Sequence, residues 1–273
     1  MLTPRPGMIN MTLRGYYRDH HRDIQFIPVY FSYERVLEIS SYLDERKGHQ
    51  KKTESLRDLF GVFRYFKLDF GQVSVNFGEP ISLEQFLSMR VDSDLEMIEP
   101  DKHKAICREL GHHIVQGINA AIPVNPTQIL ATLFVHASHL EIPEERLRRQ
   151  LRFLTTLIEA DQISSIFDQS DAQIIDYFLS TSGAERQLRD GEPMISITPG
   201  GLIDMRYYSN SVTHLFVLPS LIANRLIQEP MIDPEPFFDQ LTVLAPLLNA
   251  ICFSKLAPSA ERINELLEIF DYK

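Results

Sequence analysis

Nine histidines are the side chains of this 273-residue sequence best suited to acid–base or metal chemistry. Four of them occur as two pairs of immediate neighbours: His20 with His21, and His112 with His113. Neighbouring side chains point in different directions on a helix or a strand, so neither pair makes a metal site. His136 and His139 lie three positions apart, yet no third ligand stands at a metal-binding spacing. The sequence therefore indicates no metal and no bound cofactor.

Short motifs of well-known enzyme classes are also missing from the sequence. It contains no HExxH zinc motif, no GxSxG nucleophile turn and no GxxxxGK[ST] phosphate loop. Its two cysteines, Cys107 and Cys252, are 145 positions apart and form no CxxC motif. This spacing favours a reducing compartment over a disulfide framework.

The overall charge argues against a general nucleic-acid-binding protein. Lys and Arg number 27 against 37 Asp and Glu, which gives a formal net charge of -10, whereas phosphate contacts need a basic surface. The arginine-rich stretch LRRQLR is interpreted as the solvated face of a helix, with DNA contact as the alternative. We expect no nucleic acid among the partners.

The apolar segments are too short to cross a bilayer. The longest, VTHLFVLPSLIA at residues 212–223, has 12 residues and contains a histidine and a proline, whereas a spanning helix needs about 20 residues. The amino-terminal residues have no apolar core of a secretory signal. The sequence predicts no transmembrane span.

The elements that would position any site divide the chain into two regions. Residues 1–95 read as α/β: a helix within MINMTLRGYYRDHH, a strand at 24–34, helices at 34–47 and 54–67, and a strand at 73–77. Residues 96–273 read as mostly α-helical, with one strand candidate at 193–199. The order of helices followed by a short hairpin at 126–200 suggests a winged-helix-like bundle. These ranges are the two expected domains.

Pro28 interrupts the first of these strands, in the sequence FIPVYFSYE. Proline donates no ladder hydrogen bond and is usually excluded from central strands. A proline inside a run of strand-forming residues is therefore unusual.

Four segments in order resemble the bacterial membrane-bound glycerol-3-phosphate acyltransferases of the PlsB type, relatives of the animal mitochondrial enzyme and of dihydroxyacetone-phosphate acyltransferase. They are PRPGMI (4–9), FIPVYFSYE (26–34), VSVNFGEPI (73–81) and RYYSNSVTHLFVLPSLIA (206–223). In that family the PVY element is the last of four acyltransferase blocks. The resemblance implies that residues 1–95 are the C-terminal end of the α/β catalytic domain and that the helical region follows it.

The family's activity is then the expected function. It transfers an acyl group from acyl-CoA or acyl-carrier protein to the sn-1 hydroxyl of glycerol 3-phosphate, which gives lysophosphatidic acid for phospholipid biosynthesis. The resemblance also implies peripheral attachment to a membrane surface, the cytoplasmic face of the bacterial inner membrane.

The resemblance further implies substrate-binding roles for Pro28, Val29, Tyr30 and Arg5. Pro28 would shape the pocket, Tyr30 would donate its hydroxyl to a phosphate, and Arg5 lies next to the family's phosphate-binding loop. Alternatives remain: Pro28 as an edge-strand proline without ligand contact, Val29 as a packing residue, and Arg5 as an ordinary basic surface residue.

One feature of the family is missing from this sequence. In the family's first block, four residues separate a histidine base from an aspartate that orients it. None of the nine histidines of this sequence has Asp five positions later. We therefore expect a fragment that starts after the catalytic block. The alternative is a non-catalytic helical interaction module that retains only the end of an acyltransferase domain.

The purified 273-residue chain is predicted to catalyse no acyl transfer, because it lacks the histidine that would deprotonate the acceptor hydroxyl. The measurement is formation of lysophosphatidic acid from glycerol 3-phosphate and acyl-CoA. Product above the no-protein background would contradict the prediction.

Overall fold

The computed structural model describes most of the chain, in these ranges: 4–19, 21–33, 73–91, 98–229, 232–252, 254 and 258–271. The helices expected at 34–47 and 54–67 lie outside them. The chain divides into two compact units. The first consists of Met1–Tyr30, Val75–Ile122 and His214–Lys273, and the second of Phe31–Ser74 and Pro123–Thr213.

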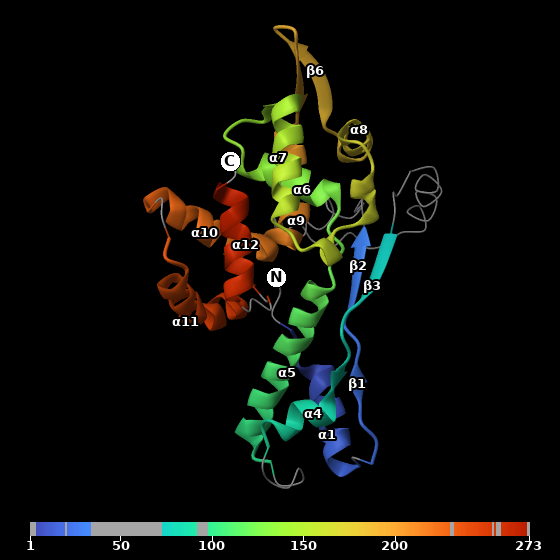
Figure 1. Ribbon diagram of the computed structural model, residues 1–273. Coiled ribbons are helices and arrows are strands. Elements are labelled where there is room, and N and C mark those ends of the chain that lie inside the picture. The colour runs from blue at the N-terminus through green and yellow to red at the C-terminus, as the bar shows by residue number, and fades with distance from the viewer. Residues whose placement is uncertain are drawn as a thin grey trace, which may run out of the picture. The chain divides into compact units, whose positions relative to one another are not determined.

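The first unit is built from helices and two very short paired strands (Figure 1). Its elements are α1 (Gly7–Arg18), β1 (Gln25–Phe26), β4 (Ile81–Ser82), α4 (Leu83–Ser88), α5 (Pro100–Ala120), α10 (Val217–Gln228), α11 (Pro234–Cys252) and α12 (Ala260–Asp271). β1 and β4 are antiparallel, with Phe26 opposite Ile81. A second two-stranded sheet pairs β2 (Val29–Tyr33) with β3 (Val73–Phe77).

The core of the first unit lies where α1 and α4 meet α5. Apolar residues at helical spacing on α1 (Leu13, Tyr16 and Tyr17) are buried, because they form one face of the helix. The side chain of Ser82 caps α4 by accepting a hydrogen bond from the backbone N–H of Gln85 at 3.1 Å. The other members of this core are Ile81, Leu83, Phe86, Leu87, Val91, Ile106, Cys107 and Leu110.

The carboxyl end of α5 is tied to the last segments of the chain. The side-chain amide of Gln116 donates to the backbone oxygen of Ser254 at 2.8 Å. The ring Nε2 of His214 lies 3.3 Å from the backbone oxygen of Asn119, which can only accept a hydrogen bond. These contacts join α5 to residues more than 90 positions later in the chain.

The second unit combines a three-stranded antiparallel sheet with helices. Its elements in chain order are α6 (Pro126–His136), β5 (Glu141–Pro143), α7 (Glu144–Thr156), two 3-10 turns (Ala160–Gln162 and Ser165–Asp168), α8 (Asp171–Ser182), β6 (Glu185–Arg189), β7 (Glu192–Ser196) and α9 (Pro199–Val212). The central strand is β7, with β5 and β6 on either side. The β6–β7 hairpin projects from the helices of its own unit (Figure 1).

Aromatic and aliphatic side chains fill the interior of this unit. The rings of Phe134 on α6 and Phe178 on α8 stack with centroids 6.0 Å apart, and both are buried. α6 also packs along α9, where the amide of Gln128 donates to the hydroxyl of Ser211 at 3.0 Å. Asn125 and Gln128 form a capping box that fixes the start of α6.

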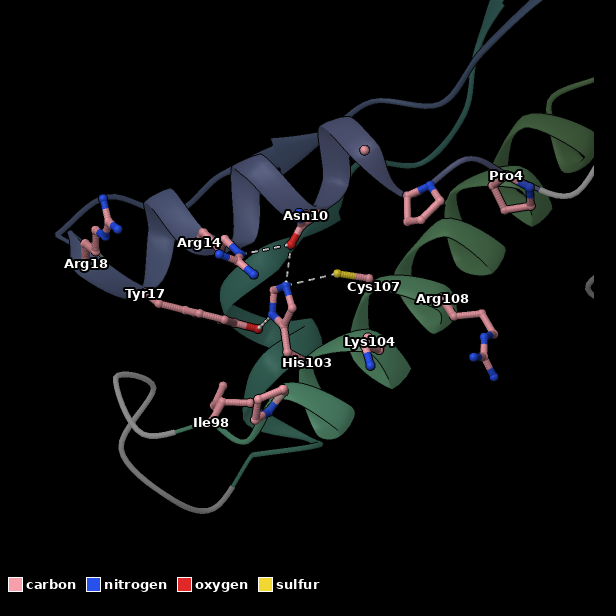
Figure 2. A pocket seen from close by; sticks show the side chains of 13 residues that line it. Pro4, Asn10, Arg14, Tyr17, Arg18, Ile98, His103, Lys104, Cys107 and Arg108 are labelled. Atoms are coloured by element: carbon pink, nitrogen blue, oxygen red, sulfur yellow. Dashed lines mark hydrogen bonds between the residues drawn. The ribbon is translucent and has the colours of Figure 1, made fainter.

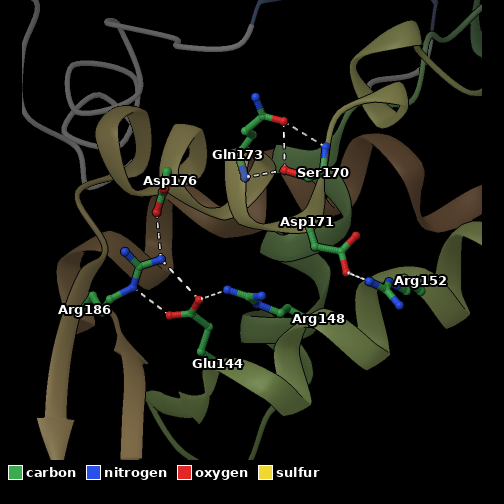
Figure 3. A network of polar contacts seen from close by, with 8 residues as sticks. All are labelled: Glu144, Arg148, Arg152, Ser170, Asp171, Gln173, Asp176 and Arg186. Carbon is green, nitrogen blue, oxygen red and sulfur yellow. Dashed lines mark hydrogen bonds and ion pairs between the residues drawn. The ribbon is translucent and has the colours of Figure 1, made fainter.

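A buried carboxylate connects α7, β6 and α8 (Figure 3). The side chain of Glu144 is 6% exposed and forms ion pairs with Arg148 and Arg186. Arg186 also pairs with Asp176 of α8 at 2.7 Å. Burial alone would raise the pKa of Glu144, but hydrogen bonds and charge from the two arginines lower that pKa below its usual value.

The structure is mostly helical with small sheets, which is compatible with an α/β region followed by helices. The expected helix in MINMTLRGYYRDHH is confirmed as α1 and the strand at 73–77 as β3. The strand candidate at 193–199 is confirmed in part, since β7 ends at Ser196 and Pro199 begins α9. The domain boundary at residue 95 and the winged-helix-like assignment of 126–200 stay predictions.

One expected element is corrected. The strand at 24–34 is divided into β1 and β2, and Ile27 and Pro28 between them belong to neither. The physical reason is the missing N–H of Pro28, which cannot donate to a neighbouring strand.

Among the described residues, no helix is both long enough and apolar enough to cross a bilayer.

Replacing Glu144 by Gln is expected to lower the free energy of unfolding by about 2 kcal/mol, because two arginines lose their buried anionic partner. The lowered pKa of Glu144 means that this stabilisation is present above the ordinary glutamate pKa of about 4.3 and is lost as the pH falls through the folded-state value. Urea unfolding at pH 7 and at pH 3 measures both effects.

Glu145→Gln is the matched control, since Glu145 is the exposed neighbour on the same turn of α7. Equal loss of stability in both variants, or a Glu144→Gln effect that grows as the pH falls, would contradict this account.

Candidate functional site

The first candidate site is centred on Pro28, which lies between β1 and β2. Pro28 is buried, and its backbone oxygen accepts a hydrogen bond from the N–H of Gly78 at 2.8 Å. Gly78 follows β3 directly and begins the sequence Gly-Glu-Pro, which belongs to no helix or strand. Because Pro28 has no N–H, it donates no hydrogen bond to a neighbouring strand. Its oxygen still accepts one from the backbone.

Two glycines make room for the Pro28 ring. A Cβ atom added at Gly117 of α5 would lie 2.7 Å from Cγ of Pro28, closer than carbon atoms approach each other. A Cβ atom at Gly78 would lie 3.2 Å from Cβ of Pro28 and 3.0 Å from the backbone oxygen of Gly117. The chain before β2, the segment after β3 and the helix α5 therefore meet at one closely packed point.

The residues that follow Pro28 extend along β2. Val29 and Tyr30 are both half-buried, and because successive strand residues face opposite sides, their side chains point to different faces of the strand. Arg5 is exposed and precedes α1. Pro28, Val29 and Tyr30 therefore lie on one continuous segment, and Arg5 lies on a different one. Contact of these four residues with a substrate stays a prediction.

A second candidate site is a pocket between α1 and α5 (Figure 2). Its volume is about 1020 Å³. Four basic side chains line it, two from each helix: Arg14 and Arg18 on α1, Lys104 and Arg108 on α5. The remaining lining residues are Pro4, Pro6, Gly7, Asn10, Tyr17, Ile98, Pro100, His103 and Cys107.

The polar floor of this pocket is a hydrogen-bonded group around His103 (Figure 2). Nε of Arg14 can only donate, and it lies 3.1 Å from Oδ1 of Asn10, so that oxygen is an acceptor. Nε2 of His103 lies 2.6 Å from the same oxygen and must therefore donate to it. This leaves Nδ1 of His103 to accept from the hydroxyl of Tyr17 at 3.4 Å.

Burial in the floor of the pocket favours the uncharged forms of its titratable side chains. Burial and the nearby charge of Arg14 lower the pKa of His103, and burial is the main cause that raises the pKa of Cys107. Burial also raises the pKa of Tyr17 to about 12. At neutral pH the positive charge of the pocket therefore comes from its arginines and its lysine.

No prediction from the sequence includes this pocket. Its signal is two pairs of basic residues at i, i+4 spacing, Arg14 with Arg18 and Lys104 with Arg108, which places each pair on one helical face. Such pairs are common on solvated helices, so only the side-by-side packing of α1 and α5 distinguishes this one.

The described residues contain no group of three or more His, Cys, Asp or Glu side chains placed to bind a metal ion. Cys107 and Cys252 are free thiols.

Comparisons with known proteins identify the sequence relationship. Residues 42–273 match the family described as the glycerol-3-phosphate acyltransferase C-terminal region. The chain is 34% identical over 276 residues to a glycerol-3-phosphate acyltransferase of Pseudomonas putida strain GB-1, a match that covers 98% of this chain and 33% of the relative. Similar proteins of the same name occur in Ectopseudomonas mendocina, at 34% identity over 93% of this chain and 32% of the relative, and in Pseudomonas aeruginosa strain LESB58, at 35% identity over 93% and 31%. The chain spans about one third of the length of these curated relatives.

Replacing Gly117 by Ala is expected to lower the free energy of unfolding by about 1 to 3 kcal/mol, because the added methyl group overlaps the rigid Pro28 ring. The matched control is Gly15→Ala on α1, where an added Cβ meets nothing within 4 Å. That change should stabilise the chain by up to about 1 kcal/mol through helix propensity. Chemical denaturation measures both, and a Gly117→Ala variant as stable as Gly15→Ala would disprove the close packing.

Proposed function

Because the chain belongs to the glycerol-3-phosphate acyltransferase C-terminal region family, we propose that it serves a glycerol-3-phosphate 1-O-acyltransferase of the PlsB type. The observation that supports this most strongly is the match over 98% of the chain to a protein of that name. The donor would be acyl-CoA or acyl-carrier protein, and the product would be lysophosphatidic acid for phospholipid synthesis.

The reaction joins the acceptor oxygen to the acyl carbon of a thioester. A general base removes the proton of the sn-1 hydroxyl as its oxygen attacks, the carbon–sulfur bond breaks, and the departing thiolate takes up a proton. The base would be the histidine of a His-x4-Asp block, a motif that these 273 residues lack. The contribution of this chain is therefore to hold substrate while a base outside it acts.

We assign the acceptor side of that task to the segment around Pro28. Its buried ring, held against Gly78 and Gly117, gives the start of β2 a fixed backbone, and a fixed wall lowers the entropy cost of orienting a substrate. Tyr30 on this strand can donate a hydroxyl hydrogen bond to a phosphate oxygen, Val29 supplies apolar packing, and Arg5 supplies a cation.

The working location that we propose is a membrane surface, the cytoplasmic face of the bacterial inner membrane. The product of the reaction is an amphiphile with one acyl chain, which partitions into a bilayer interface. A peripheral attachment would let the product enter the membrane directly.

A non-catalytic interaction module is the second candidate function. The observation in its favour is the composition of the second unit, in which helices and a projecting hairpin form a compact body of their own. We propose that residues 126–200 within it form the winged-helix-like bundle.

A chimera separates the two candidates. This chain would replace the matching third of the Pseudomonas putida relative, and we expect the chimera to acylate glycerol 3-phosphate. Introducing Tyr30→Phe into the active chimera should raise the KM for glycerol 3-phosphate about tenfold, the effect of one lost hydrogen bond to a charged group.

The control is Tyr207→Phe, since Tyr207 is half-exposed on α9 and has no assigned role in the reaction. A folded but inactive chimera would favour the interaction module. An unchanged KM in the Tyr30→Phe variant would remove Tyr30 from the acceptor site.

A further inference from the structure

The carboxyl end of α5 is held by hydrogen bonds to a later part of the chain. The side-chain amide of Gln116 donates to the backbone oxygen of Ser254 at 2.8 Å. The hydroxyl of Ser254 donates in turn to Oδ1 of Asn249 on α11, also at 2.8 Å. A chain of polar contacts therefore connects α11 to the residue directly before Gly117.

Two further contacts fix α5 on either side of Gly117. Two positions after it, the backbone oxygen of Asn119 accepts a hydrogen bond from the ring of His214. Six positions before it, a Cβ atom added at Gly111 would lie 3.2 Å from Cδ1 of Ile9 on α1, so α1 packs closely against the helix. Hydrogen bonds along the helix also resist the displacement of a single residue. The position of Gly117 is therefore set by α5 and its contacts.

The segment that carries Pro28 is held less firmly than the helix. Ile27 and Pro28 belong to no strand, and a proline has no N–H to donate. The oxygen of Pro28 accepts a hydrogen bond from the N–H of Gly78. Where the ring and the helix compete for space, the segment around Pro28 moves before α5 does. The helix thus determines where this segment lies.

The distances give the size of the effect. A Cβ atom added at Gly117 would lie 2.7 Å from Cγ of Pro28, and its removal to an ordinary carbon contact of about 3.5 to 4.0 Å needs a shift of about 1 Å. Because β2 begins at Val29, a shift of Pro28 reaches Tyr30 two residues later. A misplacement of about 1 Å can slow an enzyme reaction about a hundredfold.

We propose that Gly117 is a positioning residue for the acceptor substrate. Through the Pro28 ring, it determines where β2 and its Tyr30 lie relative to glycerol 3-phosphate. Gln116 and His214 share this role, since they hold the end of α5. The proposal rests on the acceptor site assigned under the proposed function, and it adds a task for the later helical segments, which hold the helix that places the acceptor.

The test uses the chimera with the Pseudomonas putida relative and separates KM from kcat. Gly117→Ala should raise the KM for glycerol 3-phosphate at least about tenfold and leave the KM for acyl-CoA unchanged, because the displaced segment serves the acceptor. A merely structural role would lower the amount of folded enzyme, and hence the apparent kcat, at constant KM. Gln116→Leu removes the bond to Ser254 and should raise the same KM by a smaller factor.

A second substitution shows whether the effect passes through the proline ring. Pro28→Ala removes Cγ, the atom 2.7 Å from the added methyl group, and leaves Cβ at 3.2 Å. Gly117→Ala should therefore raise the KM less in the Pro28→Ala chimera than in the chimera that keeps Pro28. Equal effects in the two backgrounds would overturn the proposal. The matched control is Gly15→Ala, where an added Cβ meets nothing within 4 Å, and both KM values should stay unchanged.

The 273-residue chain alone gives a readout that needs no activity. It has 12 glycines, so labelling glycine alone with ¹⁵N gives a simple amide spectrum, in which the signal of Gly78 is the one lost in Gly78→Ala. Because the N–H of Gly78 donates to Pro28, Gly117→Ala should shift this signal and speed its hydrogen exchange, whereas Gly15→Ala should not. An unchanged Gly78 signal in the folded Gly117→Ala chain would refute the displacement.

The outcomes separate this proposal from the proposed function. A folded but inactive chimera would overturn the acyltransferase assignment and, with it, this role of Gly117. A raised KM in Tyr30→Phe together with an unchanged KM in Gly117→Ala would overturn the positioning role alone. Thermal unfolding shows whether each variant is folded. If Gly117→Ala does not fold, Gln116→Leu carries the test, and an unchanged KM for glycerol 3-phosphate in that variant would overturn the proposal.

Discussion

The contact of one proline ring with two glycines is the constraint on which the arrangement of the first unit depends. Pro28 has no N–H to give to a sheet, and its ring occupies space that any side chain at position 117 would fill. Its oxygen accepts a hydrogen bond from the N–H of Gly78, which holds the chain before β2 against the segment after β3. A residue that weakens a strand thereby joins two strands to a helix, because the chain has exchanged ladder hydrogen bonds for packing.

This constraint could be anticipated from the sequence only in part. The resemblance singled out FIPVYFSYE and VSVNFGEPI, and Pro28 signalled an irregular strand, but nothing in the sequence near either segment indicates that Gly117, some 90 residues later, would receive the ring. A glycine inside a helix reads as a small loss of helix stability. The reason for a glycine at position 117 is evident only once the Pro28 ring is known to pack against it, since packing between distant segments leaves no local sequence pattern.

The second unit shows the same limit in its strands. α6 and α7 were predictable from apolar periodicity and from proline at their starts. β6 was not, because all five of its residues are exposed and no alternation of apolar and polar side chains marks it. Its partner β7 buries Ile195, so the sequence pattern of this hairpin lies in β7 alone. The basic pocket was not predictable for a related reason, since two ordinary i, i+4 pairs of basic residues form a pocket only when their helices pack side by side.

The contrast between the basic pocket of α1 and α5 and the acidic chain also has a kinetic consequence. Beyond a Debye length, about 8 Å at physiological ionic strength, an approaching anion senses little except the screened net charge of -10. Close to this pocket it senses four cations, and the described residues that line the pocket include no carboxylate. Long-range repulsion thus precedes short-range attraction, and added salt relieves the first before it weakens the second. The encounter rate of small anions with this protein should therefore rise with ionic strength before it falls, the opposite of the decline seen where the whole surface attracts its ligand.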